Sequence, residues 1–466
     1  MRDYSERERL FGTDGIRGTP GFYPLTDGMI FKIGLSIAKI IAYKRRKKDA
    51  PRVVIGRDTR LTGRRIEAIL CDALNFYSID VFSTGVITTP ALSFLVREIG
   101  VDMGIMISAS HNKPTDNGIK FFGPEGFKLS YEEEEWIENI IFSNLIHRPT
   151  TLRNQHMGKV YPIKRAQGQY INFLKSTVKD LTLENMHIAI DCGWGAGSQI
   201  APRLYRKLKA NVTSIHDEPK GESINIGGAL DPSYLSKIVL QKNADIGIAL
   251  DGDGDRCILV DEKGNILDGD YILAIIADYL IKKRELPKNT IVTTVMNNFG
   301  LRLFLEEIGG KIITTKVGDK YVLKALKENG LNIGGEQSGH IIFLDYLPSP
   351  DGLLTSLQVL RVLKEAGKPL SEIAGRMVKF PQVLVNVEVR KKIPFSDMPS
   401  VYGELDYFND LLKGKGRILL RYSGTENVAR VMVEGKDEKL IQEIANTLAE
   451  AIKKEIGTAT EVNSES

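Results

Sequence analysis

Short apolar runs alternate with segments of helical periodicity along most of the chain. In the first part, this pattern predicts strands at 52–55, 80–84 and 104–107 and helices at about 27–45, 63–77 and 91–99. Strands that alternate with helices at these spacings favour βαβ units and a parallel sheet. The pattern therefore predicts an α/β domain in the first part of the chain.

The same pattern returns twice. Strands are expected at 187–191, 210–215 and 245–250, and again at 290–295, 311–315 and 331–335. In all three units the third strand ends in a polar loop, at 108–112, 251–256 and 336–340. From about residue 379 the pattern changes, and strands at 383–389, 417–421 and 429–433 with a helix at 438–456 predict an α+β domain. We expect domains at 1–150, 151–254, 255–370 and 371–460, with a polar tail at 461–466.

Composition narrows the class of protein. With 466 residues the chain is too long for one core, and 42% hydrophobic with 26% charged residues is typical of a soluble globular protein. The net charge of +4 is spread along the chain, and the one dense basic run, 44–48, is placed to complement a helix end, so no nucleic-acid partner is expected. The charged N-terminus and the lack of a membrane-length apolar run predict no membrane association and a cytoplasmic location.

The first polar loop brings a hydroxyl, an imidazole and an amide to the end of a strand. These groups belong to Ser108, Ser110, His111 and Asn112. Strand ends are where α/β proteins place their chemistry. Serine and asparagine also cap helices and turns, so this loop alone leaves both interpretations open.

The second polar loop contains three alternating carboxylates, Asp251, Asp253 and Asp255. The glycines between them allow all three to face one cation, and carboxylate oxygens suit Mg²⁺. An EF-hand calcium loop is the competing motif, but Arg256 stands at its sixth position and a strand-like run follows. A metal-free surface turn also remains open.

Two further loops carry groups that suit polar ligands. In the third polar loop, Glu336, Ser338 and His340 could bind the hydroxyls of a ligand. In the last domain, the loop at 421–427 with Arg430 offers hydroxyls, backbone N–H groups and guanidinium, which together bind phosphate. Taken alone, each of these loops could be an ordinary turn.

Together the four loops resemble those of the α-D-phosphohexomutase family in their order, their spacing and their amino-acid sequences. The matching motifs are Ser-Ala-Ser-His-Asn, Asp-Gly-Asp-Gly-Asp-Arg, Gly-Glu-Gln-Ser-Gly-His and Arg-Tyr-Ser-Gly-Thr-Glu. Residues 11–18 and 317–319 are most similar to the members that act on glucosamine phosphates. The resemblance implies three similar mixed α/β/α sandwich domains and a C-terminal α+β domain around a central cleft. It also implies an isomerase that interconverts glucosamine 6-phosphate and glucosamine 1-phosphate through a phosphoserine and a sugar bisphosphate, with Mg²⁺.

The resemblance also implies roles for individual residues. Ser110 would be the phosphorylated serine, and Asp251, Asp253 and Asp255 would hold Mg²⁺ together with a phosphoryl oxygen of Ser110. The sugar would be bound by Glu336, Ser338 and His340, and phosphate by Arg256, Arg421, Ser423, Gly424, Thr425 and Arg430. Proton transfer or charge stabilisation would fall to Arg17, His111 and Lys120. Lys120 could be a general base only if Arg17 and Arg256 lowered its pKa.

The sequence departs from the family pattern at three positions. Lys113 and Asn427 stand where the family has proline, and Lys320 stands where it has arginine. These changes affect loop geometry and substrate preference rather than the reacting groups. A mutase for mannose or glucose phosphates, or a catalytically silent sugar-phosphate binding protein, remains an alternative. The partner is expected to be a small sugar phosphate, and the oligomeric state, including a homodimer, stays open.

Overall fold

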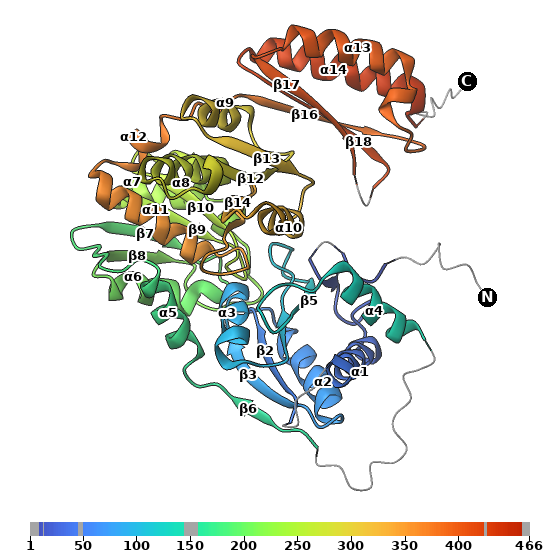
Figure 1. The fold of residues 1–466 in the computed structure, drawn as a ribbon, viewed down its shortest axis with the longest axis vertical. Coiled ribbons are helices and arrows are strands. Elements are labelled where there is room, and N and C mark those ends of the chain that lie inside the picture. The colour runs from blue at the N-terminus through green and yellow to red at the C-terminus, as the bar shows by residue number, and fades with distance from the viewer. Residues whose placement is uncertain (1–8, 13, 45–49, 144–156, 424–425, 459–466) are drawn as a thin grey trace, which may run out of the picture. The chain divides into compact units, whose positions relative to one another are not determined.

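The computed structural model describes residues 9–12, 14–44, 50–143, 157–423 and 426–458. The chain forms two compact units, one of Met1–Met296 with Ile308–Arg376 and the other of Asn297–Glu307 with Met377–Ser466 (Figure 1). Three sheets lie in the first unit and one lies in the second. Among the described helices, none combines the length and the apolar character needed to cross a bilayer.

The first sheet has the strand order β1-β5-β4-β2-β3-β6. Its strands are β1 (Ile16–Gly18), β2 (Arg52–Arg57), β3 (Asp80–Val86), β4 (Met103–Ile107), β5 (Asn117–Phe122) and β6 (Val160–Pro162). The accompanying helices are α1 (Asp27–Lys44), α2 (Gly63–Asn75), α3 (Thr89–Ile99) and α4 (Tyr131–Phe142). Strands β2, β3 and β4 are parallel, whereas β5 is antiparallel to β4. Because β6 pairs with β3, this sheet extends beyond the expected domain boundary at residue 150.

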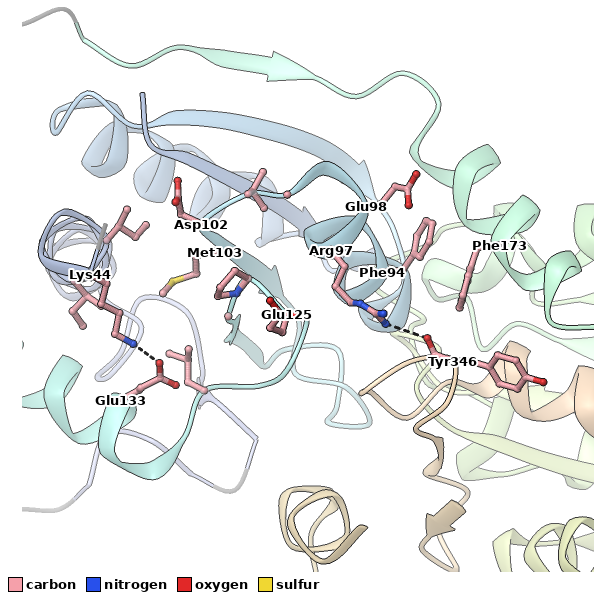
Figure 2. A pocket seen from close by; sticks show the side chains of 17 residues that line it. Lys44, Phe94, Arg97, Glu98, Asp102, Met103, Glu125, Glu133, Phe173 and Tyr346 are labelled. Atoms are coloured by element: carbon pink, nitrogen blue, oxygen red, sulfur yellow. Dashed lines mark hydrogen bonds and ion pairs between the residues drawn. The ribbon is translucent and has the colours of Figure 1, made fainter. Parts of the chain in front are cut away.

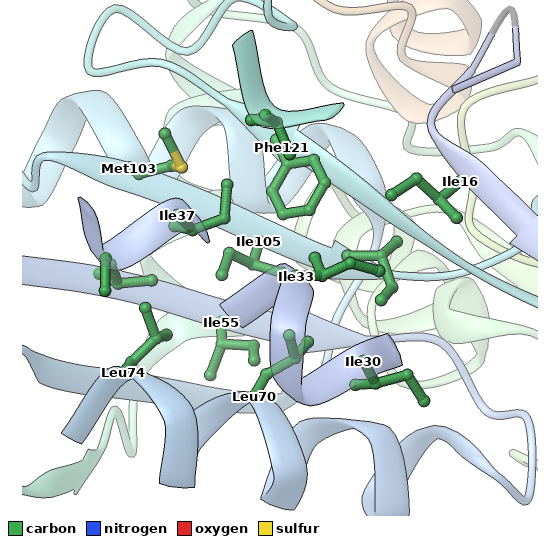
Figure 3. Close-up of a cluster of buried hydrophobic side chains, with 14 of the residues drawn as sticks. Ile16, Ile30, Ile33, Ile37, Ile55, Leu70, Leu74, Met103, Ile105 and Phe121 are labelled. Atoms are coloured by element: carbon green, nitrogen blue, oxygen red, sulfur yellow. The ribbon is translucent and has the colours of Figure 1, made fainter. Parts of the chain in front are cut away.

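The core of this first domain lies between the sheet and helices α1 and α2. Figure 3 shows Ile33 of α1 and Leu70 of α2 turned toward Ile55 and Ile105 of the sheet, all of them buried. Burying one such side chain contributes about 1.5–3 kcal/mol. The first turn of α1 contains Asp27 and the last contains Lys44, so their charges complement the helix dipole. The rest of the basic run, at 45–48, lies outside the described residues.

The second and third sheets repeat the first. The second contains β7 (His187–Asp191), β8 (Asn211–Ile215), β9 (Ile246–Leu250), β10 (Cys257–Asp261) and β11 (Ile266–Leu267). The third contains β12 (Thr290–Thr294), β13 (Lys311–Thr315), β14 (Ile333–Gly335) and β15 (Ile341–Phe343). The helices of these regions are α5 (Ala166–Ser176), α6 (Ala201–Lys207), α7 (Ser233–Lys242), α8 (Gly269–Lys283), α10 (Asp319–Asn329), α11 (Gly352–Ala366) and α12 (Leu370–Ala374).

All three sheets share one strand order, β3-β2-β4-β5, β8-β7-β9-β10 and β13-β12-β14-β15. This order confirms the predicted threefold repeat. The parallel strands that the βαβ pattern favoured are present in each sheet, and an antiparallel fourth strand follows each third strand, which gives the expected mixed α/β/α domains. Strands β10 and β11 belong to the second sheet, so the expected boundary after residue 254 divides that sheet.

The three polar loops therefore connect a parallel strand to an antiparallel neighbour. The loop after β4 leads to strand β5, and no helix lies between them, which excludes the helix-cap interpretation of Ser110. The carboxylate loop leads into strand β10, which excludes the EF-hand. Glu262, the twelfth residue of that motif, instead accepts hydrogen bonds from the backbone N and the hydroxyl of Ser371.

The second unit is an α+β module, as the alternation after residue 379 predicted. Its antiparallel sheet has the order β16-β18-β17, with β16 (Gln382–Glu388), β17 (Gly416–Tyr422) and β18 (Val428–Gly435). Helices α13 (Pro399–Leu411) and α14 (Glu438–Ile456) cover one face of this sheet (Figure 1). Helix α9 (Phe299–Glu307) also belongs to this unit, and the side chain of Asn298 donates to the carbonyl of Phe380 (2.9 Å).

Candidate active site

Ser110 lies fully buried in the loop between β4 and β5. Its hydroxyl oxygen is 3.0 Å from Asp251 Oδ2 and 3.5 Å from both Asp255 Oδ1 and His111 Nδ1. The repeat therefore brings the end of the third strand of the first sheet against the corresponding loop of the second. The hydroxyl group and the carboxylates that the sequence singled out lie in one site.

The backbone of Ser110 is held in an unusual conformation. Its φ is +48°, in the left-handed region that non-glycine residues rarely adopt. The backbone N–H of Ser110 donates to Ser108 Oγ (2.9 Å), and the Ser108 hydroxyl donates to Asp58 Oδ2 (2.7 Å). Ser108 thus supports the loop, and Asp58, which the sequence reading did not select, anchors it.

The three aspartates of the β9–β10 loop form a compact buried cluster. Asp251, Asp253 and Asp255 each offer a carboxylate oxygen, and these oxygens all lie within 4.8 Å of one another. Gly254 has φ +72°, which lets the chain turn between two of them. Burial, followed by the charges of Asp255 and Asp253, raises the pKa of Asp251 well above its usual value. Such crowding of buried carboxylates is what a divalent cation would relieve.

One atom of this cluster supports a metal in particular. Asp253 Oδ2 accepts from Thr89 Oγ1 and lies 2.9 Å from Lys120 Nζ, whereas Asp253 Oδ1 is buried with no hydrogen-bond partner among the described residues. A buried carboxylate oxygen without a partner is costly. The donor set, all hard oxygen, fits Mg²⁺.

Lys120, on strand β5, points into the same cluster. Its Nζ lies 2.8 Å from Asp14, 2.9 Å from Asp253 and 3.3 Å from Asp255. Burial lowers the pKa of Lys120, but the three carboxylates outweigh burial and raise it well above its usual value. The lowered pKa that a general-base role requires is therefore absent, because Arg17 opposes only part of this attraction. Lys120 is a cation in this site.

Arg17 approaches from strand β1. It donates to Asn112 Oδ1 (3.0 Å) and to Asp14 Oδ2 (2.5 Å). Asp14 also pairs with Lys128, which in turn pairs with Asp319. Asp14 therefore joins three cations, a role that its place in the segment 11–18 did not reveal.

The pKa values of the two histidines of the site are shifted in opposite directions. Burial, with Arg256 and Arg17 nearby, lowers the pKa of His111 to about 4, and its Nδ1 accepts from Arg256 Nη2 (2.8 Å). Burial would also lower the pKa of His340, but Asp255 and Glu336 raise it to about 10. His340 lies 2.9 Å from Asp255 and 3.1 Å from Glu336. Burial and neighbouring charges therefore make His111 a weak base and His340 a strong one.

The third loop thus meets the carboxylate loop. Arg256, in the loop between β9 and β10, and His340, in the loop between β14 and β15, form an isolated antiparallel β-bridge. Glu336 also accepts a hydrogen bond from the backbone N–H of Gly318 (3.0 Å). Ser338 lies half-buried in the same turn. All of these residues belong to the first unit.

The predicted phosphate loop lies in the second unit. Arg421 on β17 and Arg430 on β18 face each other in the strand register. Burial and the charge of Arg430 lower the pKa of Arg421. Ser423 is buried, and its hydroxyl donates to Glu426 (3.2 Å). Gly424 and Thr425 lie outside the described residues.

A cavity of about 880 Å³ among the described residues contains none of these groups. It lies beside α1, α3 and α4, where Lys44 pairs with Glu133 and Arg97 donates to the carbonyl of Tyr346 (3.1 Å; Figure 2). Cavity size alone therefore does not mark the candidate site.

Four regions of the chain match domain families of the phosphoglucomutase/phosphomannomutase group. Residues 8–146, 168–264 and 268–380 match its alpha/beta/alpha domains I, II and III, and residues 384–451 match its C-terminal domain. The chain belongs to the phosphoglucomutase/phosphomannomutase family.

Two relatives within this family, both phosphoglucosamine mutases, are similar to this chain over nearly its whole length. The phosphoglucosamine mutase of Nitratidesulfovibrio vulgaris is 45% identical over 450 residues, which is 96% of this chain and 99% of that protein. The phosphoglucosamine mutase of Geobacter metallireducens is 45% identical over 452 residues, covering 97% and 99%.

Solved structures share the fold. A phosphoglucomutase/phosphomannomutase family protein from Burkholderia thailandensis has a TM-score of 0.78 at 23% identity and covers 96% of this chain and 97% of its own. The N-acetylphosphoglucosamine mutase of Aspergillus fumigatus, in complex with GlcNAc-6P and magnesium, has a TM-score of 0.64 at 17% identity and covers 96% of each chain.

Proposed function

We propose that this chain is a phosphoglucosamine mutase, which interconverts glucosamine 6-phosphate and glucosamine 1-phosphate. The observation that carries the proposal is the buried hydroxyl of Ser110, 3.0 Å from Asp251 in a cluster of three aspartates. Relatives at 45% identity over nearly the whole chain support this choice of substrate.

Ser110 is the phosphoryl carrier in this proposal. A phosphoserine carries about −1.5 to −2 charges, which three bare aspartates would repel. Asp251, Asp253 and Asp255, with a phosphoryl oxygen of Ser110, would hold Mg²⁺, which when bound neutralises charge on the transferring phosphoryl group. Protonated Lys120, 2.9 Å from Asp253, adds positive charge to the same place.

The reaction consists of two phosphoryl transfers. In the first, the bond between phosphorus and Ser110 Oγ breaks while a bond to the free sugar oxygen forms, which gives a sugar bisphosphate. The sugar hydroxyl loses a proton and the serine gains one, so the half-reaction is balanced. After the bisphosphate turns around, its other phosphate returns to Ser110. Of the three candidates for proton transfer, His111 has a lowered pKa, whereas Lys120 and Arg17 have raised pKa values and stay protonated.

The remaining residues would bind the substrate. Glu336, Ser338 and His340 would hold sugar hydroxyls, and Arg256 would approach the reacting phosphate. The other phosphate would be held by Arg421, Ser423, Gly424, Thr425 and Arg430. This grip must accept either end of the sugar, since the bisphosphate has to turn around.

A coupled assay tests the function. The purified chain is given glucosamine, mannose and glucose 6-phosphates in turn, with Mg²⁺ and a trace of the matching bisphosphate, and kcat/KM is compared. The highest value is expected with glucosamine 6-phosphate. A preference for mannose or glucose phosphate would instead assign the chain to a sibling mutase, and calorimetric binding without exchange would make it a silent binding protein.

A further inference from the structure

Asn225 connects the two loops that contain Ser110 and the aspartates. It lies half-buried between β8 and α7. Its Nδ2 donates to the carbonyl of Ser110 (2.8 Å) and to that of Asn112 (2.9 Å). Its Oδ1 accepts from the backbone N–H of Gly252 (2.7 Å). One carboxamide therefore bridges the serine loop and the carboxylate loop.

Arg60 holds the same two carbonyls. Its Nη2 donates to Ser110 O (2.9 Å) and to Asn112 O (2.8 Å). Each carbonyl oxygen has two lone pairs, so Arg60 and Asn225 together can satisfy both. Arg60 belongs to the same domain as Ser110, whereas Asn225 comes from the second sheet region, and only Asn225 also contacts the carboxylate loop.

The approach of the loops at Asn225 is close. A Cβ added at Gly252 would lie 2.7 Å from Ile224 Cδ1 and 3.0 Å from Asn225 Oδ1, so a larger residue there would displace these side chains. The left-handed Ser110 persists only where its surroundings determine its conformation. The hydrogen bonds of Asn225 therefore hold both the loop of Ser110 and the loop of Asp251.

Asn225 is itself fixed by its own loop. Its φ is +67°, a left-handed value that asparagine tolerates better than most residues. Its backbone N–H donates to Gly193 O (2.9 Å). Further along this loop, the backbone N–H of Gly228 donates to Asp191 Oδ2 (3.0 Å) at the end of β7. The loop that contains Asn225 is therefore anchored to the second sheet.

We propose that Asn225 is a positioning residue that sets the distance between Ser110 and the aspartates, by holding both loops through one carboxamide. Its role in turnover rests on the proposed mutase function. Asn225 contacts the backbone of both loops and is assigned no contact with sugar, so it should affect kcat and metal affinity rather than the KM for sugar phosphate.

The test compares glycine substitutions at two left-handed asparagines. Asn225→Gly removes the bridge without backbone strain, and Asn243→Gly makes the same change at the exposed C-cap of α7, where φ is +48°. Residues that orient metal ligands typically contribute about 10–100-fold in affinity or activity. We expect Asn225→Gly to lower kcat and to weaken Mn²⁺ binding, measured by electron paramagnetic resonance, by about that factor. The KM should stay the same, and Asn243→Gly should match the unmodified protein.

Asn225→Asp is the second variant. It keeps the acceptor for Gly252 but replaces the donor with a carboxylate oxygen facing two carbonyls, so the loss should be similar. Full activity of Asn225→Asp, or values for Asn225→Gly within twofold of Asn243→Gly, would overturn the proposal. Loss of native circular dichroism in both Asn225 variants would also overturn it, by assigning the residue to folding. If the unmodified protein turns over no sugar phosphate, the proposed function fails, while the Mn²⁺ comparison still decides the role of Asn225.

Discussion

Arginine is used in opposite ways beside the serine loop, at Arg60, and on strands β17 and β18, at Arg421 and Arg430. Arg60 is 1% exposed and all five of its N–H groups donate, one to Asp58 and four to backbone carbonyls. Arg421 is only partly buried and stands opposite another cation, Arg430, whose Nη2 lies 3.3 Å from Glu426.

This difference distinguishes a fixed part of the protein, the serine loop held by Arg60, from a receptive part, the pair of Arg421 and Arg430. A guanidinium whose donors are all used inside the protein holds a backbone in place and has none left for a ligand. Two arginines side by side repel each other, and a bound phosphate would relieve that repulsion with charge-assisted hydrogen bonds. The serine loop is thus held in one geometry, whereas the pair of Arg421 and Arg430 is suited to bind an anion.

The largest effect is expected at the fixed part, from Ser110→Ala. Loss of the phosphoryl carrier should lower kcat by at least about 10⁴-fold, since covalent catalysis depends on this oxygen. Intact-protein mass spectrometry should also lose any shift of one phosphate. Exposed Ser396 provides a matched control, and a Ser110→Ala protein as active as Ser396→Ala would refute the phosphoserine scheme.

Removing the metal should have the next largest effect. Asp253→Asn neutralises the carboxylate whose Oδ1 lacks a hydrogen-bond partner, and we expect kcat to fall by about 10²–10³-fold, as for loss of one stabilising group in an active site. EDTA should stop turnover of the unmodified protein and Mg²⁺ should restore it. Exposed Asp410→Asn is the control, and turnover that continues in EDTA would rule out a metal at these aspartates.

The third prediction concerns stability at Arg60. Arg60→Met removes the ion pair with Asp58 and the donors to four carbonyls, and breaking a buried ion pair in this way costs about 3–5 kcal/mol. Both tryptophans, Trp136 and Trp194, lie in the first unit, so fluorescence-detected urea unfolding reports on that unit.

The control for this change is Arg65→Met. Arg65 pairs with Asp27 and its side chain is 72% exposed, so water screens the pair and the unfolding midpoint should not move. Equal midpoints for the Arg60 and Arg65 variants would remove the distinction between a fixed and a receptive arginine.

Much of the fold was predictable because local signals agreed. Alternating apolar runs located the three repeats, and the switch to a polar loop after each third strand located Ser110, Asp251 and Glu336. The fourth strands of the first and third sheets, β5 and β15, were not predicted. Strand β5 begins with Asn117 and Gly118, and β15 is three residues long. β5 has the length of a strand but begins with residues typical of turns, and β15 is too short to show alternation.

The supporting residues could not be selected in the same way. Asp58 and Arg60 follow strand β2, which was a visible signal, but their partners lie about 50 residues further along the chain. Asn225 bonds to Ser110 across 115 residues in sequence, and nothing local marks it. Lys120 was a candidate general base only if Arg17 and Arg256 lowered its pKa, and that condition left out Asp14, whose charge raises the pKa. Contacts between distant segments decided all of these cases.

The smallest effect is expected at the receptive part. Arg421→Gln should raise the KM for sugar phosphate by about 10–100-fold, the loss of one or two charge-assisted hydrogen bonds, and leave kcat nearly unchanged. Because these charges are partly exposed, added salt should also raise the KM of the unmodified protein, and less so that of the variant. Arg302→Gln, on α9 of the same unit and 63% exposed, is the control. If Arg421→Gln lowered kcat at constant KM, Arg421 would belong to the fixed machinery and the contrast with Arg60 would fail.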